Sequence, residues 1–229
     1  MKRYFSLVLI FFLFLGSVFS QSKQTFFTGF FPEVSITKRI SELQKINFKV
    51  ENQHVVFDNR DADSENPQFS HYRTDVMGFY DYSLRHGISV AMGLFHRFQE
   101  GEDANRIIQQ LAVLQKGRNF RVNHRFRTDQ TFTRNQPLEL RFRYRLSLEL
   151  PLEGAELDPG EFYLLSSVES IFSYKGGEYE IENRLAVSLG KFFNRKEKLE
   201  WGVDYRTDGY LQDGFRTRLW AKISYFYNF

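Results

Sequence analysis

The segment from Leu138 to Leu150 alternates strictly between apolar and polar side chains, with Leu, Phe or Tyr at its even positions and Glu, Arg or Ser at its odd positions. Only a β-strand places every second residue on one face. Its thirteen residues exceed the roughly 5 to 6 of an average globular strand. At about 3.3 Å per residue and a tilt of about 40°, such a strand rises roughly 33 Å, enough to cross an apolar layer of about 25 Å. The segment therefore predicts a membrane-crossing strand.

Other segments repeat this pattern with different purity, and no stretch has a helical period. The ten further strand candidates are 24–40, 46–51, 69–84, 87–94, 104–115, 120–132, 161–173, 178–187, 198–206 and 214–229. Connections alternate between short ones, at 85–87, 116–118 and 194–197, and longer ones, at 58–68, 99–103 and 208–214, as in membrane barrels. The segment 151–160 is the exception, because it is long where a short turn is expected.

The pattern predicts an all-β fold, a transmembrane up-and-down antiparallel β-barrel. Eleven candidates conflict with the even strand number of bacterial single-chain barrels, whose two termini share one side. We therefore predict twelve strands, with ten as the alternative. Gly29 and Pro32 interrupt the pattern of 24–40 and are the expected point at which this segment divides into two strands.

Residues 1–20 have the features of a secretory signal peptide. Lys2 and Arg3 precede an apolar run from Tyr4 to Phe19, and cleavage is predicted after Ser20. The remaining 21–229 are predicted to form a single domain in the outer membrane of a Gram-negative bacterium. Removing two of the 31 basic residues leaves 29 against 28 acidic ones, so no nucleic-acid partner is expected. The chain has no cysteine, which excludes disulfides and thiolate chemistry.

The end of the chain resembles the C-terminal assembly signal of outer-membrane barrels, and we expect it to act as one. Ile223, Tyr225, Tyr227 and the terminal Phe229 share one strand face. Such an end resembles the segment that the barrel assembly machinery recognises by adding a strand, where main-chain hydrogen bonds supply affinity and alternate side chains fill pockets. The predicted partners are therefore this machinery and outer-membrane lipids. The oligomeric state does not follow from the sequence.

The charged face of the strands must point away from lipid. If it faced lipid, Arg141, Arg143 and Arg145 would each cost roughly 2 to 4 kcal/mol near the bilayer midplane. We therefore expect charged side chains to face the barrel interior, or lumen. The predicted lumen-facing charges are Arg121, Arg125, Arg127, Glu139, Arg141, Arg143, Arg145, Glu149, Glu169, Glu180, Glu182, Arg184, Glu200, Asp204 and Arg206.

Two interpretations of this lumen remain open. Basic residues concentrate around 121–145 and acidic ones around 169–204, so neighbouring strands of opposite sign can pair. Such pairs would form a salt-bridged core that holds a narrow barrel closed. Alternatively, the charges form a constriction that selects solutes. We favour the first interpretation, because ten to twelve strands lie between small barrels filled by side chains and open porins of about sixteen strands.

The sequence offers little for catalysis or metal binding. Lipid-acting barrels need a hydroxyl within reach of an imidazole on the outer wall. His124 lies on an apolar strand face, but its neighbours there, Val122 and Phe126, have no hydroxyl. We therefore predict no catalytic residue, no cofactor and no metal site.

Three other features have structural interpretations. His71, Arg73 and Asp75 share one strand face and would form a polar cluster in the lumen, without a second imidazole for a metal. The carboxylates of 58–65 are spaced as in calcium loops, but the central Gly and distal Glu are missing, so a solvated outside loop is expected. The aromatic residues predicted for the membrane-interface girdles are Tyr80, Tyr82, Tyr144, Trp201, Tyr205, Trp220 and Tyr227.

The strand sequences RFRYRLSLELPL (141–152), EFYLLSSVESIF (161–172), ENRLAVSLGKFF (182–193) and LEWGVDYRTDGY (199–210) resemble a family of outer-membrane proteins of Gram-negative bacteria, known as domain of unknown function 2490. The resemblance extends from about Gln24 to Phe229. It implies an outer-membrane β-barrel and contributes no reaction, cofactor or partner.

Three functional hypotheses follow. The first is a narrow or closed channel, or a structural barrel, with a charged and salt-bridged lumen. The second is a lipid-acting enzyme of the phospholipase or deacylase type. The third is a soluble periplasmic barrel that binds an apolar ligand.

Overall fold

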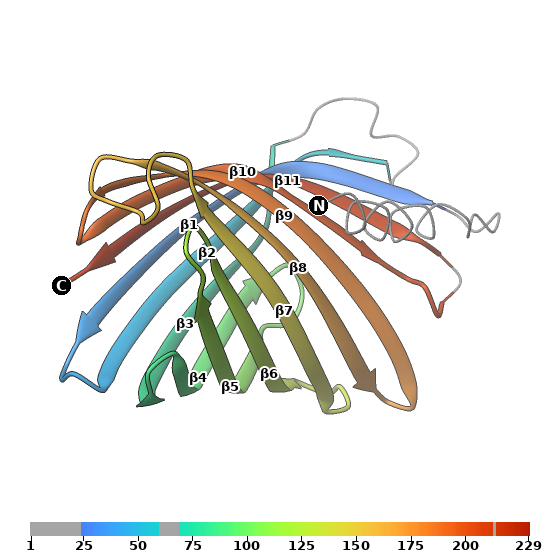
Figure 1. The fold of residues 1–229 in the computed structure, drawn as a ribbon. Helices are drawn as coiled ribbons and strands as arrows, with labels where there is room; N and C mark the ends of the chain where they lie inside the picture. Colours follow the sequence, from blue (N-terminus) through green and yellow to red (C-terminus); the bar gives the residue numbers. More distant parts are fainter. Residues whose placement is uncertain (1–23, 60–68, 213) are drawn as a thin grey trace, which may run out of the picture.

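A computed structural model describes residues 24–59, 69–212 and 214–229 as one closed β-barrel (Figure 1). The predicted export signal, residues 1–20, lies outside the described residues, as does most of the carboxylate loop 58–65. The strands are β1 (Thr25–Arg39), β2 (Gln44–Asp58), β3 (Ser70–Arg85), β4 (Ile88–Gln99), β5 (Ala104–Lys116), β6 (Arg121–Thr133), β7 (Glu139–Pro151), β8 (Phe162–Lys175), β9 (Glu178–Asn194), β10 (Glu197–Asp208) and β11 (Arg216–Asn228).

The predicted strand count was wrong, because the described residues form a closed barrel of eleven strands and neither twelve nor ten. Residues 24–40 do not divide: β1 runs through Gly29 and Pro32 as one strand. Pro32 is tolerated because it falls in a gap of the β1–β2 ladder, between the pairs Phe30–His54 and Glu33–Glu51. The missing N–H of proline therefore removes no hydrogen bond to β2.

The odd number determines how the barrel closes. Each strand is antiparallel to its sequence neighbour, but β1 and β11 run parallel, from the pair Thr25–Arg216 to the pair Thr37–Asn228. Figure 1 shows the first strand, in blue, beside the last, in red. The start of β1 and the end of β11 therefore lie at opposite rims, whereas an even number would place them together.

The connections differ between the two rims. The C-terminal rim, where β11 ends, carries the connections 40–43, 86–87, 117–120 and 195–196 and the longer segment 152–161. The opposite rim carries 100–103, 134–138 and 176–177, together with the end of β2, the start of β3, the end of β10 and the start of β11. The segment 152–161 therefore remains the long connection among the short ones of its rim.

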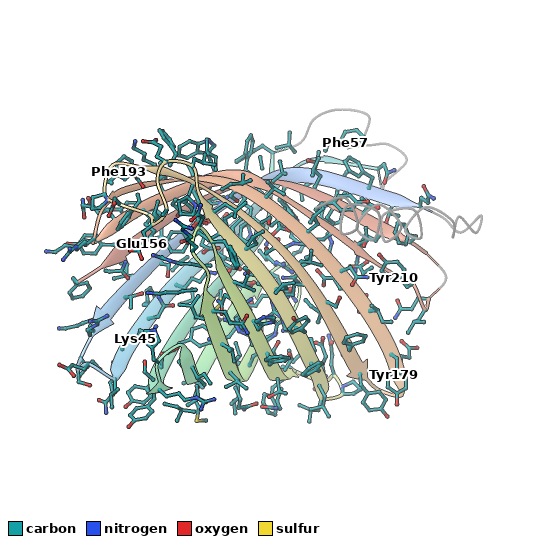
Figure 2. The ribbon with its side chains drawn as sticks, in the orientation of Figure 1. Lys45, Phe57, Glu156, Tyr179, Phe193 and Tyr210 are labelled. Carbon is teal, nitrogen blue, oxygen red and sulfur yellow. The ribbon has the colours of Figure 1, made fainter. Side chains whose placement is uncertain are left out.

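The wall separates two chemical environments. Along β7, Leu140 and Phe142 are each 44% exposed on the outer face, while the neighbouring strands hold Asp129 and Glu169 at 1% exposure inside. The period of two in the strands produces this separation, because a closed sheet has one face inside and one outside. Figure 2 shows side chains on both sides of the wall, with Tyr179 and Phe193 at its periphery.

The lumen also holds two apolar clusters that the charge pattern did not predict. One comprises Met77, Phe79, Ala91, Phe95 and Ile108 on β3, β4 and β5. The other comprises Phe27, Phe31, Val55 and Trp220 with Tyr72 beside it, on β1, β2, β11 and β3. These clusters fill part of the interior, as side chains do in small barrels.

Trp220 corrects the girdle prediction. It is fully buried inside the barrel, and its ring packs edge-on against Phe27 at 5.7 Å. The physical reason is its position in the alternation of β11: the residues two before and two after it, Arg218 and Lys222, both line the lumen. Of the other predicted girdle residues, Trp201 is exposed on the outside.

Glycines on the inner wall make room for rings. A Cβ on Gly93 would lie 2.4 Å from the ring of Phe79, and a Cβ on Gly190 would lie 2.2 Å from the ring of Tyr163. Each glycine is the neighbouring-strand partner of the aromatic residue whose ring lies over it. Gly93 thus allows β3 to place the ring of Phe79 inside.

Candidate functional site: the charged lumen

The lumen contains a cavity of about 260 Å³ lined mainly by charged side chains. It brings together eleven of the predicted lumen-facing residues: Arg125, Arg127, Glu139, Arg141, Arg143, Arg145, Glu180, Glu182, Arg184, Asp204 and Arg206. The remaining four lie elsewhere. Arg121 and Glu149 pair with each other near the C-terminal rim at 3.2 Å, Glu200 accepts a hydrogen bond from the Tyr163 hydroxyl, and Glu169 lies buried in the wall.

Glu169 is the centre of an arginine cluster. Its carboxylate lies 3.0 Å from Arg125, 3.1 Å from Arg143, 3.5 Å from Arg145 and 3.5 Å from Arg184. These arginines come from β6, β7 and β9, on both sides of its own strand β8. One buried carboxylate therefore links β8 to its two neighbours, β7 and β9, and to β6 beyond β7, by charge-assisted hydrogen bonds and ion pairs.

Asp129 is a second buried carboxylate, which was absent from the predicted set. It lies 2.6 Å from Arg141 and 3.6 Å from Arg143. Arg143 therefore lies between two carboxylates, Asp129 on β6 and Glu169 on β8. Asp129 was recognisable in the sequence, because it continues the odd-numbered polar series that includes Arg125 and Arg127.

Strands that the charge pattern did not single out complete the network. Glu33 on β1 lies 3.0 Å from Lys49 and 2.8 Å from Lys222. Asp75 on β3 accepts two hydrogen bonds of 2.7 Å from Arg97. Asp208 contacts two arginines of β11, and Arg206 donates to Asp204 at 2.6 Å. The regular alternation of β7 made the charged face of β7 and its neighbouring strands easy to predict. In β1, β3 and β11 aromatic residues alternate with charged ones on the inner face, so the charge pattern of these strands is less regular.

The charges that line the cavity do not balance. The cations are Lys49, Arg73, Arg97, Arg106, Arg125, Arg127, Arg141, Arg143, Arg145, Arg184, Arg206, Arg216, Arg218 and Lys222. The carboxylates are Glu51, Asp75, Glu139, Glu180, Glu182, Asp204 and Asp208, and the buried Glu33, Asp129 and Glu169 contact cations of the first set. Around this cavity, fourteen cations of the described residues therefore face ten carboxylates.

The predicted cluster of His71, Arg73 and Asp75 does not form. Arg73 and Asp75 line the lumen, but the register of β3 shifts between the pairs Gln53–Arg73 and His54–His71, which leaves Tyr72 as an extra residue. Such a bulge moves the residues before it to the other face. His71 is therefore exposed, and its Nε2 lies 2.9 Å from the hydroxyl of Thr74.

The outer wall carries a hydroxyl beside His124 that the sequence reasoning missed. The ring Nδ1 of His124 lies 2.9 Å from the Tyr144 hydroxyl. Tyr144 belongs to the adjacent strand β7, so the pair arises only from the register of β6 against β7. The pair gives each of these two polar groups a partner on the outer face.

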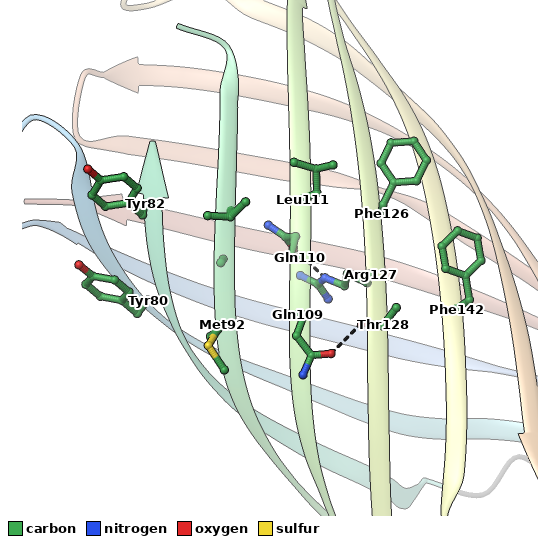
Figure 3. A pocket seen from close by; sticks show the side chains of 12 residues that line it. Tyr80, Tyr82, Met92, Gln109, Gln110, Leu111, Phe126, Arg127, Thr128 and Phe142 are labelled. Carbon is green, nitrogen blue, oxygen red and sulfur yellow. Dashed lines mark hydrogen bonds between the residues drawn. The ribbon is translucent and has the colours of Figure 1, made fainter. Parts of the chain in front are cut away.

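A groove of about 490 Å³ crosses the outer face of β3 to β7 (Figure 3). Tyr80, Met92, Leu111, Phe126 and Phe142 are among the exposed residues that line it. A small polar cluster lies in the middle of this face. The Gln109 Oε1 accepts from the Thr128 hydroxyl at 2.6 Å, and its Nε2 donates to Gln130 at 3.0 Å. The three polar residues thus hydrogen-bond one another.

The C-terminal residues close the barrel. Ile223 and Phe229 are exposed on the outer face, and the Tyr225 hydroxyl donates to Glu197 at 3.0 Å. The main-chain N–H of Phe229 donates to Thr37 on β1 at 2.9 Å, and the ring of Tyr227 lies 5.9 Å from that of Phe229. In the closed barrel, β1 therefore occupies the edge of β11.

The comparisons with known proteins identify a family. A family model described as a protein of unknown function (DUF2490) matches residues 28–213. The chain belongs to this family. No curated protein and no solved structure matches the chain.

Across 24–59, 69–212 and 214–229, no group of three or more His, Cys, Asp or Glu side chains is arranged to hold a metal ion. The same residues contain no helix with the length and apolar composition needed to span a membrane.

Proposed function

We propose that this member of the DUF2490 family is an outer-membrane β-barrel whose lumen is closed, or narrowed to a small conduit, by buried ion pairs and aromatic clusters. The proposal rests on one observation: the barrel has its apolar side chains outside and its carboxylates and arginines inside. In water this arrangement would expose a large apolar surface, which soluble monomers avoid.

Strand length supports a membrane location. The shortest strands, β4 and β10, each have twelve residues. At about 3.3 Å per residue and a tilt of about 40°, twelve residues rise roughly 30 Å, more than the apolar band of about 25 Å in outer-membrane barrels. Lipids of the outer membrane and the barrel assembly machinery are the partners that this function requires. The export signal in residues 1–20 would carry the chain to the machinery.

The contents of the lumen support a closed or narrow barrel over an open pore. Trp220, Tyr163, Phe27 and Phe31 are buried inside, and the cavity among the charges measures only about 260 Å³. The four arginines around Glu169 cross-link strands through the interior. Open porins of about sixteen strands instead leave an aqueous channel.

Solubility and gel migration test the membrane location. We expect the mature chain to require detergent for extraction and to migrate faster on a gel when it is not boiled, because a closed barrel resists unfolding by the gel detergent. Protein that stays monodisperse in plain buffer without detergent would refute the proposal and favour the soluble ligand-binding barrel.

Planar-bilayer recording tests the closed lumen. We expect no large steady conductance from the refolded barrel. Any small conductance should prefer anions, because cations outnumber carboxylates on the wall. Replacing Arg141 and Arg143 by Glu should then shift the selectivity toward cations, whereas Glu156→Gln, in the exposed segment 152–161, should leave it unchanged. Conductance steps as large as those of an open porin would contradict the closed lumen.

Lipid hydrolysis is the second candidate function, and one contact on the outer face favours it. The Thr74 hydroxyl lies 2.9 Å from the His71 imidazole and accepts a hydrogen bond of 2.8 Å from Asn52. A hydroxyl paired with an imidazole is the minimal arrangement for nucleophilic attack. We rank it second because no carboxylate contacts this imidazole among the described residues. Loss of phospholipid hydrolysis in both Thr74→Val and His71→Ala would support it, and loss in His124→Ala would point to the Tyr144 pair instead.

A further inference from the structure

The excess positive charge of the lumen lies on one wall. On β9, β10, β11, β1 and β2, six cations face six carboxylates. On β3 to β8, eight arginines face only four carboxylates, which are Asp75, Asp129, Glu139 and Glu169. Among the described residues counted around the cavity, all four surplus charges therefore lie on the wall of β3 to β8, which we call the arginine wall.

Within the arginine wall, like charges lie directly opposite each other. In the β6–β7 register, Arg125 pairs with Arg145 and Arg127 pairs with Arg143. Like charges at opposite positions of neighbouring strands destabilise a sheet. The Glu169 carboxylate compensates three of these four arginines, because the guanidinium groups of Arg125, Arg143 and Arg145 each lie within 3.5 Å of it. Arg127 is the member that Glu169 does not contact at this range.

Two arginines of this wall have no carboxylate within 4 Å among the described residues. Arg127 donates from Nε to Gln110 at 2.7 Å, and its guanidinium lies 4.9 Å above the ring of Phe79 (Figure 3 shows the Gln110 contact). Arg106 is 6% exposed and donates from Nε to Thr131 at 2.9 Å. In both, a neutral group accepts a hydrogen bond from the Nε, and both residues line the cavity.

Other donors of the wall are also unpaired. The buried Nε atoms of Arg125, Arg141, Arg143 and Arg145 have no hydrogen-bond acceptor among the described residues. A buried donor without an acceptor costs about 1 to 3 kcal/mol, and more when it is charged. These buried Nε atoms lie out of reach of the cavity, so it is the surplus charge of the wall that favours negatively charged oxygen there.

We infer that the lumen binds a small, multivalent oxyanion of the phosphate type on the arginine wall, with Arg127 as the principal ligand. Guanidinium groups bind phosphate oxygens in a bidentate manner. A tetrahedral oxyanion accepts hydrogen bonds from several directions, as donors spread over several strands require. The surplus of four charges favours a multivalent anion over chloride, and the cavity of about 260 Å³ limits the ligand to a small one.

This inference depends on the proposed function in one respect, which is that the charged face is inside a folded barrel. It does not depend on the membrane location. Phosphate binding by a barrel that proved soluble would refute the membrane location and leave the anion site intact. Gel migration without boiling reports the folded barrel separately from ligand binding, so the two failures are distinguishable.

The test is calorimetric titration of inorganic phosphate into the refolded mature chain, in a nonionic detergent without phosphate groups, with sodium chloride at equal ionic strength as the reference. Arg127→Gln should weaken phosphate binding by about tenfold, the loss of a charge-assisted hydrogen bond. Arg216→Gln is the matched control: it removes the same charge from the same cavity, but on the balanced wall. It should change the affinity by less than about twofold.

Arg127→Lys separates the effect of the guanidinium geometry from the effect of the positive charge. It also keeps the test valid if the Gln variant fails to fold. It retains the positive charge and should still bind phosphate several-fold more weakly, because an ammonium group cannot form the bidentate contact. Equal losses in Arg127→Gln and Arg216→Gln, or heats that chloride reproduces at the same ionic strength, would overturn the inference.

A second titration distinguishes free phosphate from a lipid headgroup. Short-chain phosphatidylglycerol in mixed micelles carries the same phosphate chemistry on a lipid. Binding of inorganic phosphate that Arg127→Gln weakens supports a site for a free ion inside the lumen. A response to the lipid without any response to inorganic phosphate would overturn that site.

Discussion

Replacing Glu169 by Gln tests whether ion pairs hold the lumen together. The substitution keeps the shape of the side chain and removes its charge, at a residue that is 1% exposed and lies within 3.5 Å of Arg125, Arg143, Arg145 and Arg184. Removing one partner of a buried ion pair costs about 3 to 5 kcal/mol, because the other charge is left uncompensated. Here four arginines lose a shared carboxylate, so we expect a loss at the upper end of this range.

Urea unfolding of the refolded barrel in detergent micelles measures the effect. The free energy of unfolding should fall by about 4 to 5 kcal/mol in Glu169→Gln and by less than about 0.5 kcal/mol in Glu156→Gln, the exposed control. Removing a cation as well, in Glu169→Gln with Arg145→Gln, should recover part of the loss, since it lowers the repulsion among the remaining arginines. A loss below about 1 kcal/mol in the single variant would refute the reasoning, because it would mean that water compensates these arginines.

Two further predictions concern packing and assembly. Gly93→Ala should destabilise the barrel by about 1 to 3 kcal/mol, because the new Cβ would lie 2.4 Å from the ring of Phe79. Gly78→Ala on the neighbouring strand, where nothing lies within 4 Å of a Cβ, should change stability by less than about 0.5 kcal/mol in the same urea assay. Deleting Phe229 should lower the amount of folded barrel in outer-membrane fractions. Unchanged amounts would show that assembly does not depend on recognition of the last residue.

The faces of the wall were predictable because they depend on a local property. A strand alternates whatever its neighbours are, so the polar positions of β6 and β7 identify the same side of the sheet before any partner is known. The same argument applied to β11 would have placed Trp220 inside with Arg218 and Lys222. The inward position of Trp220 was therefore predictable from the alternation, and the girdle prediction overlooked it. Eleven strand candidates were also visible, and the error arose from preferring an even number to the pattern itself.

The histidines show where local reasoning fails. One extra residue, Tyr72, turns His71 from the lumen to the outer face, and no feature of the sequence around it marks the bulge. His124 meets the Tyr144 hydroxyl because β6 and β7 pair in one particular register. A shift of that register by two residues would keep every side chain on its face and separate this pair.

The sequence by itself determined that this chain forms long amphipathic strands with charges on one side and apolar groups on the other, because a period of two needs no tertiary information. Only the tertiary structure decided that eleven strands close by a parallel pair, and that Glu169 contacts Arg125 from two strands away. It also decided that the surplus charge lies on the arginine wall, with Arg106 and Arg127 lacking a carboxylate. The physical reason is that contacts across a lumen depend on register, bulges and closure, which are properties of the whole barrel.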